Sequence, residues 1–342
     1  MKQGIKLVGL LAAGALALSA CGTTASTPTS SAPADGSEAP SSQAIETVAF
    51  EPGEVVKPAD GEVIKIGVTF PILDQFLQTV ADGIEARAKE AGVEVTIVAA
   101  QEKADVQLGQ VENFISQGLD GIIIIPVDTD AAGPMTEKAM DAEIPLVYVN
   151  RRPSDLPAGV PYVGSNSLVA GQLQMKALAE LADGKGKVGI LIGDPANEAA
   201  RDRTEGCKQI LEEYPEMELL REQAGNWYRE EGLAITENWI QSGDEIDIIC
   251  ANNDEMALGA IQALKNADKL DDVLVGGVDA TADALAAMAA GELEVTVFQD
   301  AAGQGAGGVD SIINLYNGEE VAGVIDVPYQ LVTPDNMADF EK

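Results

Sequence analysis

The stretch IKIGVTFPILDQF at residues 64–76 contains the features from which the fold can be predicted. Its first seven residues, 64–70, form an apolar run with β-branched side chains, which is typical of a buried strand. The run ends in a polar segment that contains Asp74 and Phe76, and a helical pattern follows at 77–91. The sequence therefore predicts a strand, a turn with two distinctive side chains, and a helix.

The same unit recurs along the chain. Strands that alternate with helices of this length predict βαβ units, parallel sheets and right-handed crossovers. The expected helices cover 77–91, 104–117, 131–142, 168–182, 200–213, 230–242, 254–267, 281–290 and 303–316. Roughly ten strands are many for one sheet, and two domains fit ordinary domain size better. We therefore expect an α/β fold with two doubly wound parallel-sheet lobes.

Short connecting segments could carry the chain between these lobes more than once and form a hinge. We expect these segments near residues 162–166, 298–300 and 324–327. The N-terminal lobe would then comprise 63–164 and 300–326, and the C-terminal lobe 165–299 and 327–342.

Side chains suited to a polyhydroxylated ligand follow most of the predicted strands. Ligands of open α/β sheets bind outside the carboxyl ends of the strands. Carboxylates, amides and guanidinium groups can hold neighbouring hydroxyls by paired hydrogen bonds, and aromatic rings can stack on the C–H faces of a sugar ring. The candidate ligand-binding residues are Asp74, Phe76, Asn150, Arg151, Arg201, Trp227, Asn253, Asp279 and Gln299.

Some of these residues have simpler explanations. Arg151 and Arg201 could form surface ion pairs in an acidic protein, although the forked guanidinium suits vicinal hydroxyls. We place Arg152 and Arg203, their nearest arginine neighbours, outside the site.

The two aromatic candidates lie in polar sequence, unlike a core aromatic. This context favours ligand stacking for Trp227 and Phe76, whereas Trp239 has helical spacing and apolar neighbours and is expected in the core. Asn253 ends a predicted buried strand, and the simple alternative is a helix start at which Asp254 is the cap.

The composition excludes several classes of protein. The chain has 21 Lys plus Arg against 56 Asp plus Glu, a formal net charge of -35, so nucleic acid and anionic membrane surfaces are not expected partners. It has no histidine, which excludes His-ligated zinc, Ser-His-Asp triads and Cys-His pairs. We expect no cofactor and no metal.

Two glycine motifs superficially match a dinucleotide fingerprint. The one at 184–189 precedes a predicted strand, although a fingerprint must follow one, so it indicates a helix end and a turn. The one at 303–308 lies in the last unit, where close packing of its helix is the better interpretation. Cys207 and Cys250 have apolar neighbours and are expected to be buried free thiols, with a disulfide as the alternative.

The N-terminus has the pattern of a secretion signal. Lys2 and Lys6 precede a short apolar stretch at 7–18, and the sequence LSACG at 18–22 resembles a bacterial lipobox. The resemblance implies a signal peptide at 1–20 and a lipid attached to Cys21; an ordinary signal peptide is the alternative. Residues 21–62 are rich in Ser, Thr, Ala and Pro, which predicts a flexible tether between a lipid anchor and a folded body outside the cytoplasmic membrane.

Residues 63–335 resemble the periplasmic sugar-binding proteins of ABC importers, of the ribose- and galactose-binding type. The most specific segments are AARDRTEG (199–206), ANNDEMALGAI (251–261), VGGVD (275–279) and VFQ (297–299). Segments at 225–229, 278–281, 298–304 and 331–337 look most like the inositol and rhizopine binders. The resemblance implies a type I periplasmic binding protein, whose two lobes close by hinge bending around a ligand.

The resemblance assigns ligand contacts to the same nine candidate residues. Leu77 stands where ribose binders have a second stacking aromatic, and Asn150 stands where they have an acid. Both departures argue against simple ribose. The calcium loop of galactose binders is not recognisable, so no structural metal is implied.

The resulting hypothesis is a lipid-anchored substrate-binding protein of an ABC importer. Its ligand would be a neutral polyol, with myo-inositol or a related cyclitol favoured over a monosaccharide. Its partners would be the permease subunits in the membrane, and the protein would be a monomer. A sensory receptor that presents the ligand to a signalling partner is one alternative. The other is a sugar-processing enzyme in which Asp74 and Asp279 act as paired carboxylates.

Overall fold

A computed structural model of the chain describes residues 45–59 and 61–341. The predicted signal peptide, residues 21–44 of the predicted tether and the lipidation site Cys21 lie outside the described residues. Within the described part, no helix combines the length and apolarity needed to cross a membrane.

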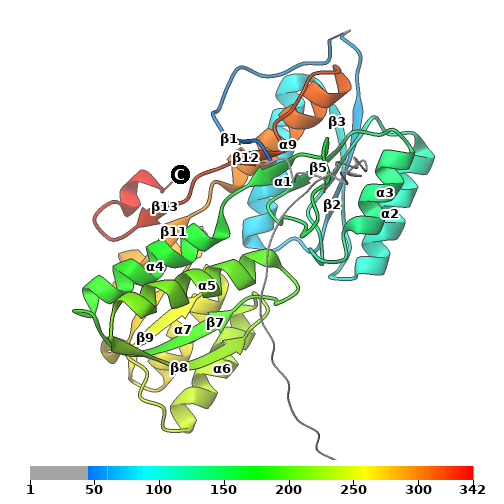
Figure 1. Cartoon of the computed structure of the whole chain (residues 1–342). Helices are drawn as coiled ribbons and strands as arrows, with labels where there is room; N and C mark the ends of the chain where they lie inside the picture. Colours follow the sequence, from blue (N-terminus) through cyan, green and yellow to red (C-terminus); the bar gives the residue numbers. More distant parts are fainter. Residues whose placement is uncertain (1–44, 60, 342) are drawn as a thin grey trace, which may run out of the picture. The chain divides into compact units, whose positions relative to one another are not determined.

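Seven parallel strands form the first sheet, in the order β1-β12-β6-β5-β4-β2-β3 (Figure 1). These strands are β1 (Thr47–Ala49), β2 (Lys65–Phe70), β3 (Glu94–Ala99), β4 (Gly121–Ile124), β5 (Leu146–Val149), β6 (Tyr162–Gly164) and β12 (Val324–Asp326). Every residue of β4 and β5 is buried. Burial on both faces explains why these strands read as unbroken apolar runs instead of alternating ones.

Helices cover both faces of the first sheet (Figure 1). They are α1 (Gln75–Ala91) and α9 (Ala301–Tyr316) on one face, and α2 (Ala104–Gln117) and α3 (Gly133–Asp141) on the other. Successive strand residues point to opposite faces. Accordingly, Ile123 belongs to the core beneath α1 and α9, and Ile122 to the core beneath α2 and α3. This sheet and its helices are called the first lobe below.

The second sheet has four parallel strands in the order β10-β9-β7-β8. Its strands are β7 (Lys185–Ile192), β8 (Glu216–Ala224), β9 (Ile248–Ala251) and β10 (Leu274–Gly276). An antiparallel pair lies beside β10 and is joined to this region by isolated bridges; it consists of β11 (Thr296–Phe298) and β13 (Gln330–Val332). Its helices are α4 (Ser167–Leu181), α5 (Glu198–Glu213), α6 (Arg229–Gln241), α7 (Asp254–Asn266) and α8 (Ala282–Ala289), with short 3-10 turns at Leu270–Asp272 and Met337–Asp339. These elements are called the second lobe.

The chain passes between the lobes at three places (Figure 1). The first crossing joins β6 to α4, the second joins β11 to α9, and the third joins β12 to β13. The backbone N–H of Val327 in the third crossing donates to the Gly164 carbonyl at the start of the first, at 2.8 Å. The prediction of two α/β parallel-sheet lobes joined by several segments is confirmed.

The predicted tether ends earlier than residue 62. Thr47–Ala49 form β1 and pair with β12 in parallel at the edge of the first sheet, and Phe50 packs against the core. The prediction of an unstructured stretch was wrong for these residues. An edge strand of three residues depends on a partner near the other end of the chain, which local composition does not reveal.

Glycines allow α1 and α9 to pack very closely. A Cβ atom added to Gly83 of α1 would lie 2.6 Å from the carbonyl oxygen of Ala302, and one added to Gly305 of α9 would meet the carbonyl oxygen of Val80. The second glycine motif therefore serves helix packing, as predicted. The first supplies the turn between α4 and β7, where Gly184 has a φ of 71°.

Gly83→Ala is expected to destabilise the protein by about 1–3 kcal/mol, because one of the two packed backbones must move. Gly109→Ala in α2 is the matched control. No atom lies within 4 Å of its added Cβ, so this variant should gain up to about 1 kcal/mol of helix propensity. Urea unfolding measures both values, and equal stability of the two variants would contradict the packing argument.

The two cysteines of the described chain form a disulfide. Cys207 of α5 and Cys250 of β9 are both buried, and their sulfur atoms are joined. The expectation of free thiols was wrong. Both residues have apolar neighbours in the sequence, and only the packing of α5 on β9 shows that the two side chains meet.

Candidate functional site

One cavity brings together eight of the nine predicted site residues. It is lined by Asp74, Phe76, Leu77, Asn150, Arg151, Ala199, Arg203, Trp227, Asn253, Asp279 and Gln299. Its volume is about 40 Å³, far below the roughly 300–1,000 Å³ of clefts for drug-sized ligands. A larger hollow of about 610 Å³ shares Phe76, Asp279 and Gln299 with it and has a lining that mixes apolar and polar residues. The smaller cavity has the chemistry of a site for one small polar molecule.

The two sheets explain why these residues meet. In the first lobe, Asp74 follows β2 and Asn150 follows β5. In the second lobe, Asn253 follows β9, while Gln299 lies in the second crossing. The carboxyl ends of the strands of both lobes therefore face a common space, as expected for doubly wound sheets.

Arg201 is the predicted residue that lies outside the cavity, and Arg203 takes its place. The side chain of Arg201 is 40% exposed and pairs with Asp130 at 3.3 Å, whereas that of Arg203 is 6% exposed and lines the cavity. Residues two positions apart in an α-helix are separated by about 200° around its axis. Arg201 and Arg203 of α5 therefore face nearly opposite directions. The spacing of Ala199, Arg203 and Cys207, each four residues apart on the buried face, could have identified the arginine that lines the cavity.

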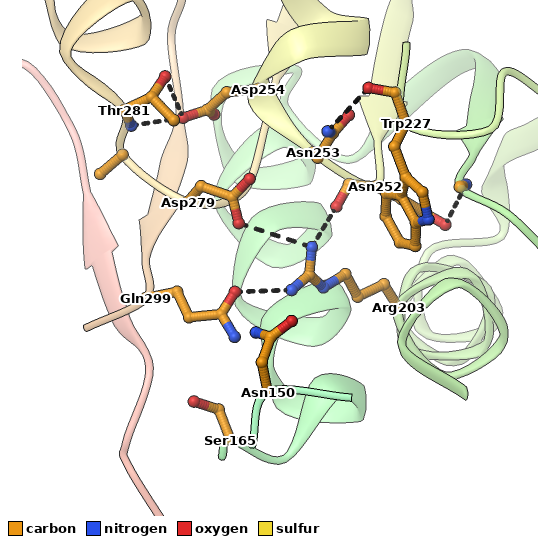
Figure 2. A network of polar contacts seen from close by, with 12 residues as sticks. Asn150, Ser165, Arg203, Trp227, Asn252, Asn253, Asp254, Asp279, Thr281 and Gln299 are labelled. Atoms are coloured by element: carbon orange, nitrogen blue, oxygen red, sulfur yellow. Dashed lines mark hydrogen bonds and ion pairs between the residues drawn. The ribbon is translucent and has the colours of Figure 1, made fainter. Parts of the chain in front are cut away.

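The Arg203 guanidinium is fixed by several partners (Figure 2). It donates to the backbone oxygen of Asn252 at 2.7 Å and to Oε1 of Gln299 at 2.9 Å, and it lies 3.8 Å from Asp279. Its central carbon is 5.7 Å from the ring centre of Trp227. Burial acts to lower the pKa of Arg203, but nearby groups, among them Tyr329 and Asp279, more than offset this, so the pKa is raised and the charge is retained.

Burial raises the pKa of Asp279 well above its usual value, and the charge of Arg203 opposes this shift. The same effect acts on Asp74, where burial raises the pKa while the Leu77 backbone N–H and Arg151 act in the opposite direction. Burial lowers the pKa of Arg151, and Asp74 opposes that shift. Each lobe therefore contributes one carboxyl and one guanidinium group to the cavity, and their formal charges cancel.

Three cavity residues have backbone angles in the left-handed region. The φ angles are 65° at Asn150, 74° at Trp227 and 123° at Asp279. Such angles are uncommon outside glycine, cost on the order of 1–3 kcal/mol each, and cluster at functional sites. Trp227 also needs Gly193 beneath it, because a Cβ there would collide with the indole ring. The fold therefore accepts strain in order to present these side chains.

Helix caps hold two of the predicted residues. Asp74 is the N-cap of α1, and its Oδ1 accepts from the Leu77 N–H at 2.7 Å. Asn253 is the N-cap of α7, where its Oδ1 accepts from the Met256 N–H and its Nδ2 donates to the Trp227 carbonyl, both at 3.1 Å. The cap of α7 is thus Asn253 itself rather than its neighbour, and this residue both lines the cavity and holds the Trp227 backbone.

From the sequence, Asp254 was considered only as a possible cap at a helix start. It was not identified as a residue that supports the cavity. It is fully buried and accepts from the Thr281 N–H at 2.8 Å (Figure 2). It also accepts from the Thr296 hydroxyl at 2.7 Å. Burial raises its pKa to about 7. Nothing in the local sequence distinguishes it from an ordinary exposed acid in the first turn of a helix.

The contribution of Asp254 to stability should therefore fall as pH rises from about 4 to 7. Because the pKa of Asp254 is about 7 in the folded protein and 3.8 as its usual value, its contribution is fully present below pH 3.8 and is lost by about pH 7. Asp254→Asn should flatten this slope in urea unfolding between pH 4 and 7.5. The exposed Asp271→Asn is the control, and a slope unchanged by Asp254→Asn would contradict the assignment.

Two buried donors in the cavity lack a partner among the described residues. They are Nε of Arg203 and Nε1 of Trp227. A buried donor without an acceptor costs about 1–3 kcal/mol. A ligand rich in oxygen acceptors would remove this cost.

A family comparison matches these features. Residues 66–320 match the model of the periplasmic binding protein domain family, which is most of the chain. The chain belongs to this family. This periplasmic binding protein is accordingly a binding protein and not an enzyme, and the alternative of a sugar-processing enzyme is set aside.

Individual relatives agree with this assignment. The Rhizobium meliloti protein named "Putative rhizopine-binding protein" is 46% identical over 284 residues, which cover 81% of this chain and 92% of the relative. A xylitol-binding protein of Mycolicibacterium smegmatis is 33% identical, covering 82% and 80%. A solved ABC transporter solute binding protein from Bacillus halodurans C-125, with bound myo-inositol, has a TM-score of 0.80 and 44% identity, covering 83% and 99%.

Proposed function

We propose that the protein is an extracytoplasmic substrate-binding lipoprotein of an ABC importer that takes a neutral polyol between its lobes. We favour myo-inositol or a related cyclitol, followed by a monosaccharide. The observation that carries the proposal is the small cavity in which two carboxyl and two guanidinium groups balance beside Phe76 and Trp227. A neutral ring with many hydroxyls suits this balance of formal charges and the two aromatic faces.

Each kind of cavity group has a role toward such a ligand. The indole of Trp227 and the ring of Phe76 offer faces for C–H groups, while Arg151 and Arg203 can donate to hydroxyl oxygens. Asp74 and Asp279 can accept from hydroxyl groups. Because ligand contacts would come from both lobes, binding would favour the closed arrangement over an open one.

The relatives support the ligand class. One is named for rhizopine, one for xylitol, and one solved structure contains myo-inositol. Lipid attachment at Cys21, delivery to membrane permease subunits and a monomeric state complete the proposal. A sensory receptor with the same ligand is the remaining alternative, and it would present the closed form to a signalling partner instead of a permease.

Calorimetric titration of the ligand-free protein with inositols, hexoses, pentoses and xylitol tests the proposal. Myo-inositol or another cyclitol should bind most tightly. If a hexose binds most tightly, the preferred ligand is a monosaccharide and the proposed class of neutral polyols stands. Absence of heat, together with absence of any thermal shift for every polyol, would refute the proposed ligand class.

The ion pair of Arg201 with Asp130 predicts a small effect of Arg201 on polyol affinity, which the same titration measures. Thr129 of the first lobe donates through its N–H to the Ala196 carbonyl of the second lobe at 3.1 Å, and Arg201 pairs with Asp130 nearby. These contacts join the lobes without lining the cavity.

Arg201→Ala should therefore weaken ligand binding by about 1.4-fold to fivefold, because an exposed ion pair is worth roughly 0.2–1 kcal/mol toward closure. The factor should be the same for every ligand. Lys138→Ala removes an exposed pair with Glu112 within the first lobe and should leave affinity unchanged. A ligand-dependent factor for Arg201→Ala would instead indicate direct contact with the ligand.

A further inference from the structure

Side chains of the first two crossings are bonded to cavity residues. In the first crossing, the Ser165 hydroxyl accepts from Nε2 of Gln304 at 2.9 Å, and Oε1 of Gln304 accepts from Asn150 at 3.0 Å. In the second crossing, Gln299 itself lines the cavity and accepts from Arg203. The hinge and the cavity are thus connected by hydrogen bonds.

Tyr329 makes the corresponding connection from the third crossing. Its hydroxyl accepts from Nη2 of Arg203 at 2.9 Å, and its ring centre lies 5.8 Å from the guanidinium carbon. The ring is 8% exposed and packs against Ala170, Val278 and Val297. Tyr329 does not line the cavity, so it acts on the ligand indirectly, and its hydrogen bond to Arg203 links it to a residue that does line the cavity.

We propose that Tyr329 is a positioning residue that couples the third hinge crossing to the ligand-facing guanidinium of Arg203. Arginine has a long side chain with several rotatable bonds, and its fork gains specificity only when its direction is fixed. The ring centres of Trp227 and Tyr329 lie 5.7 Å and 5.8 Å from the central guanidinium carbon of Arg203. Of these two aromatic residues, Tyr329 lies on a hinge segment. Bending of that segment therefore changes the support of Arg203. This inference rests on the proposed function.

The hydroxyl group separates this role from simple packing. The ring packs against apolar side chains, and a phenylalanine would fill the same space. A buried tyrosine hydroxyl needs polar partners, and here they are Arg203 and the side chain of Ser167. Removing only the oxygen should therefore leave the fold intact and release the guanidinium.

Tyr329→Phe is the test, with Tyr214→Phe as the matched control. Tyr214 lies at the end of α5 and does not line the cavity. Tyr329→Phe should weaken binding of myo-inositol, or of the tightest polyol found, about fivefold to tenfold, with the thermal unfolding temperature lowered by no more than about 10 °C. In an Arg203→Lys background the same change should have less than about a twofold effect, because the coupling acts through the guanidinium.

A second measurement does not depend on ligand. The ¹⁵N–¹H signal of the Arg203 Nε–H group, assigned by its loss in Arg203→Lys, should broaden or shift in ligand-free Tyr329→Phe and stay unchanged in Tyr214→Phe. An unchanged signal would overturn the proposal, as would equal effects of Tyr329→Phe in both backgrounds. If wild-type protein binds no polyol, the proposed function fails, while the signal still shows whether Tyr329 positions Arg203.

Discussion

Asp279→Ala is expected to abolish measurable polyol binding while the protein remains folded. Asp279 is buried, lies 3.8 Å from Arg203, and is one of the two carboxyl groups in the cavity. Truncating one partner of a buried charge pair costs about 2–5 kcal/mol or more, which corresponds to a loss of roughly 30-fold to several thousandfold in affinity. Calorimetric titration measures the loss, and thermal unfolding verifies the fold.

Two further variants make this result specific. Asp283→Ala removes an acid from the exposed start of α8, where it pairs with Arg229, and should bind like wild type. Asp279→Asn keeps the shape and removes the charge, so it should bind weakly but unfold at the same or a higher temperature, because burial disfavours the ionised carboxylate. Retained affinity in Asp279→Ala would remove this residue from the site.

Arg203→Lys is expected to weaken binding by about 2–3 kcal/mol, or roughly 30-fold to 150-fold. The substitution keeps the positive charge but removes the planar fork that donates to Asn252 and Gln299 at the same time. The cost is large because the neighbouring acceptors are buried and lose their donors.

Arg201→Lys is the natural control, since it makes the same change two residues away on the exposed side of α5. It keeps a cation near Asp130 and should bind within about twofold of wild type. Titration of both variants decides which arginine serves the ligand. The opposite order of affinities would restore Arg201 to the site and exclude Arg203.

The sequence predicted the fold and most of the cavity because both follow from a repeated local pattern. Buried parallel strands read as apolar runs, and the residues that end them must meet at one edge of the sheet. Asn150 and Asp279 could be found in this way without knowledge of the three-dimensional structure. Trp227 could be found because an aromatic ring in polar sequence is unusual.

Most of the differences depend on contacts distant in sequence. The choice between Arg201 and Arg203 is an exception, because it depended on the rotation of α5, which was visible in the spacing but was not used. The pairing of β1 with β12 and the disulfide between α5 and β9 depend on packing that no local pattern encodes. Tyr329 likewise looks like an ordinary core residue until its hydroxyl is seen beside Arg203.

The position of β1 has a mechanical consequence. This strand pairs in parallel with β12, and β12 leads directly into the third crossing. Tension drawn through residue 45 would load the hydrogen bonds of one three-residue edge strand before any other part of the first sheet. β1 could separate from β12 first. The force would then not reach the hinge on which opening and closing depend.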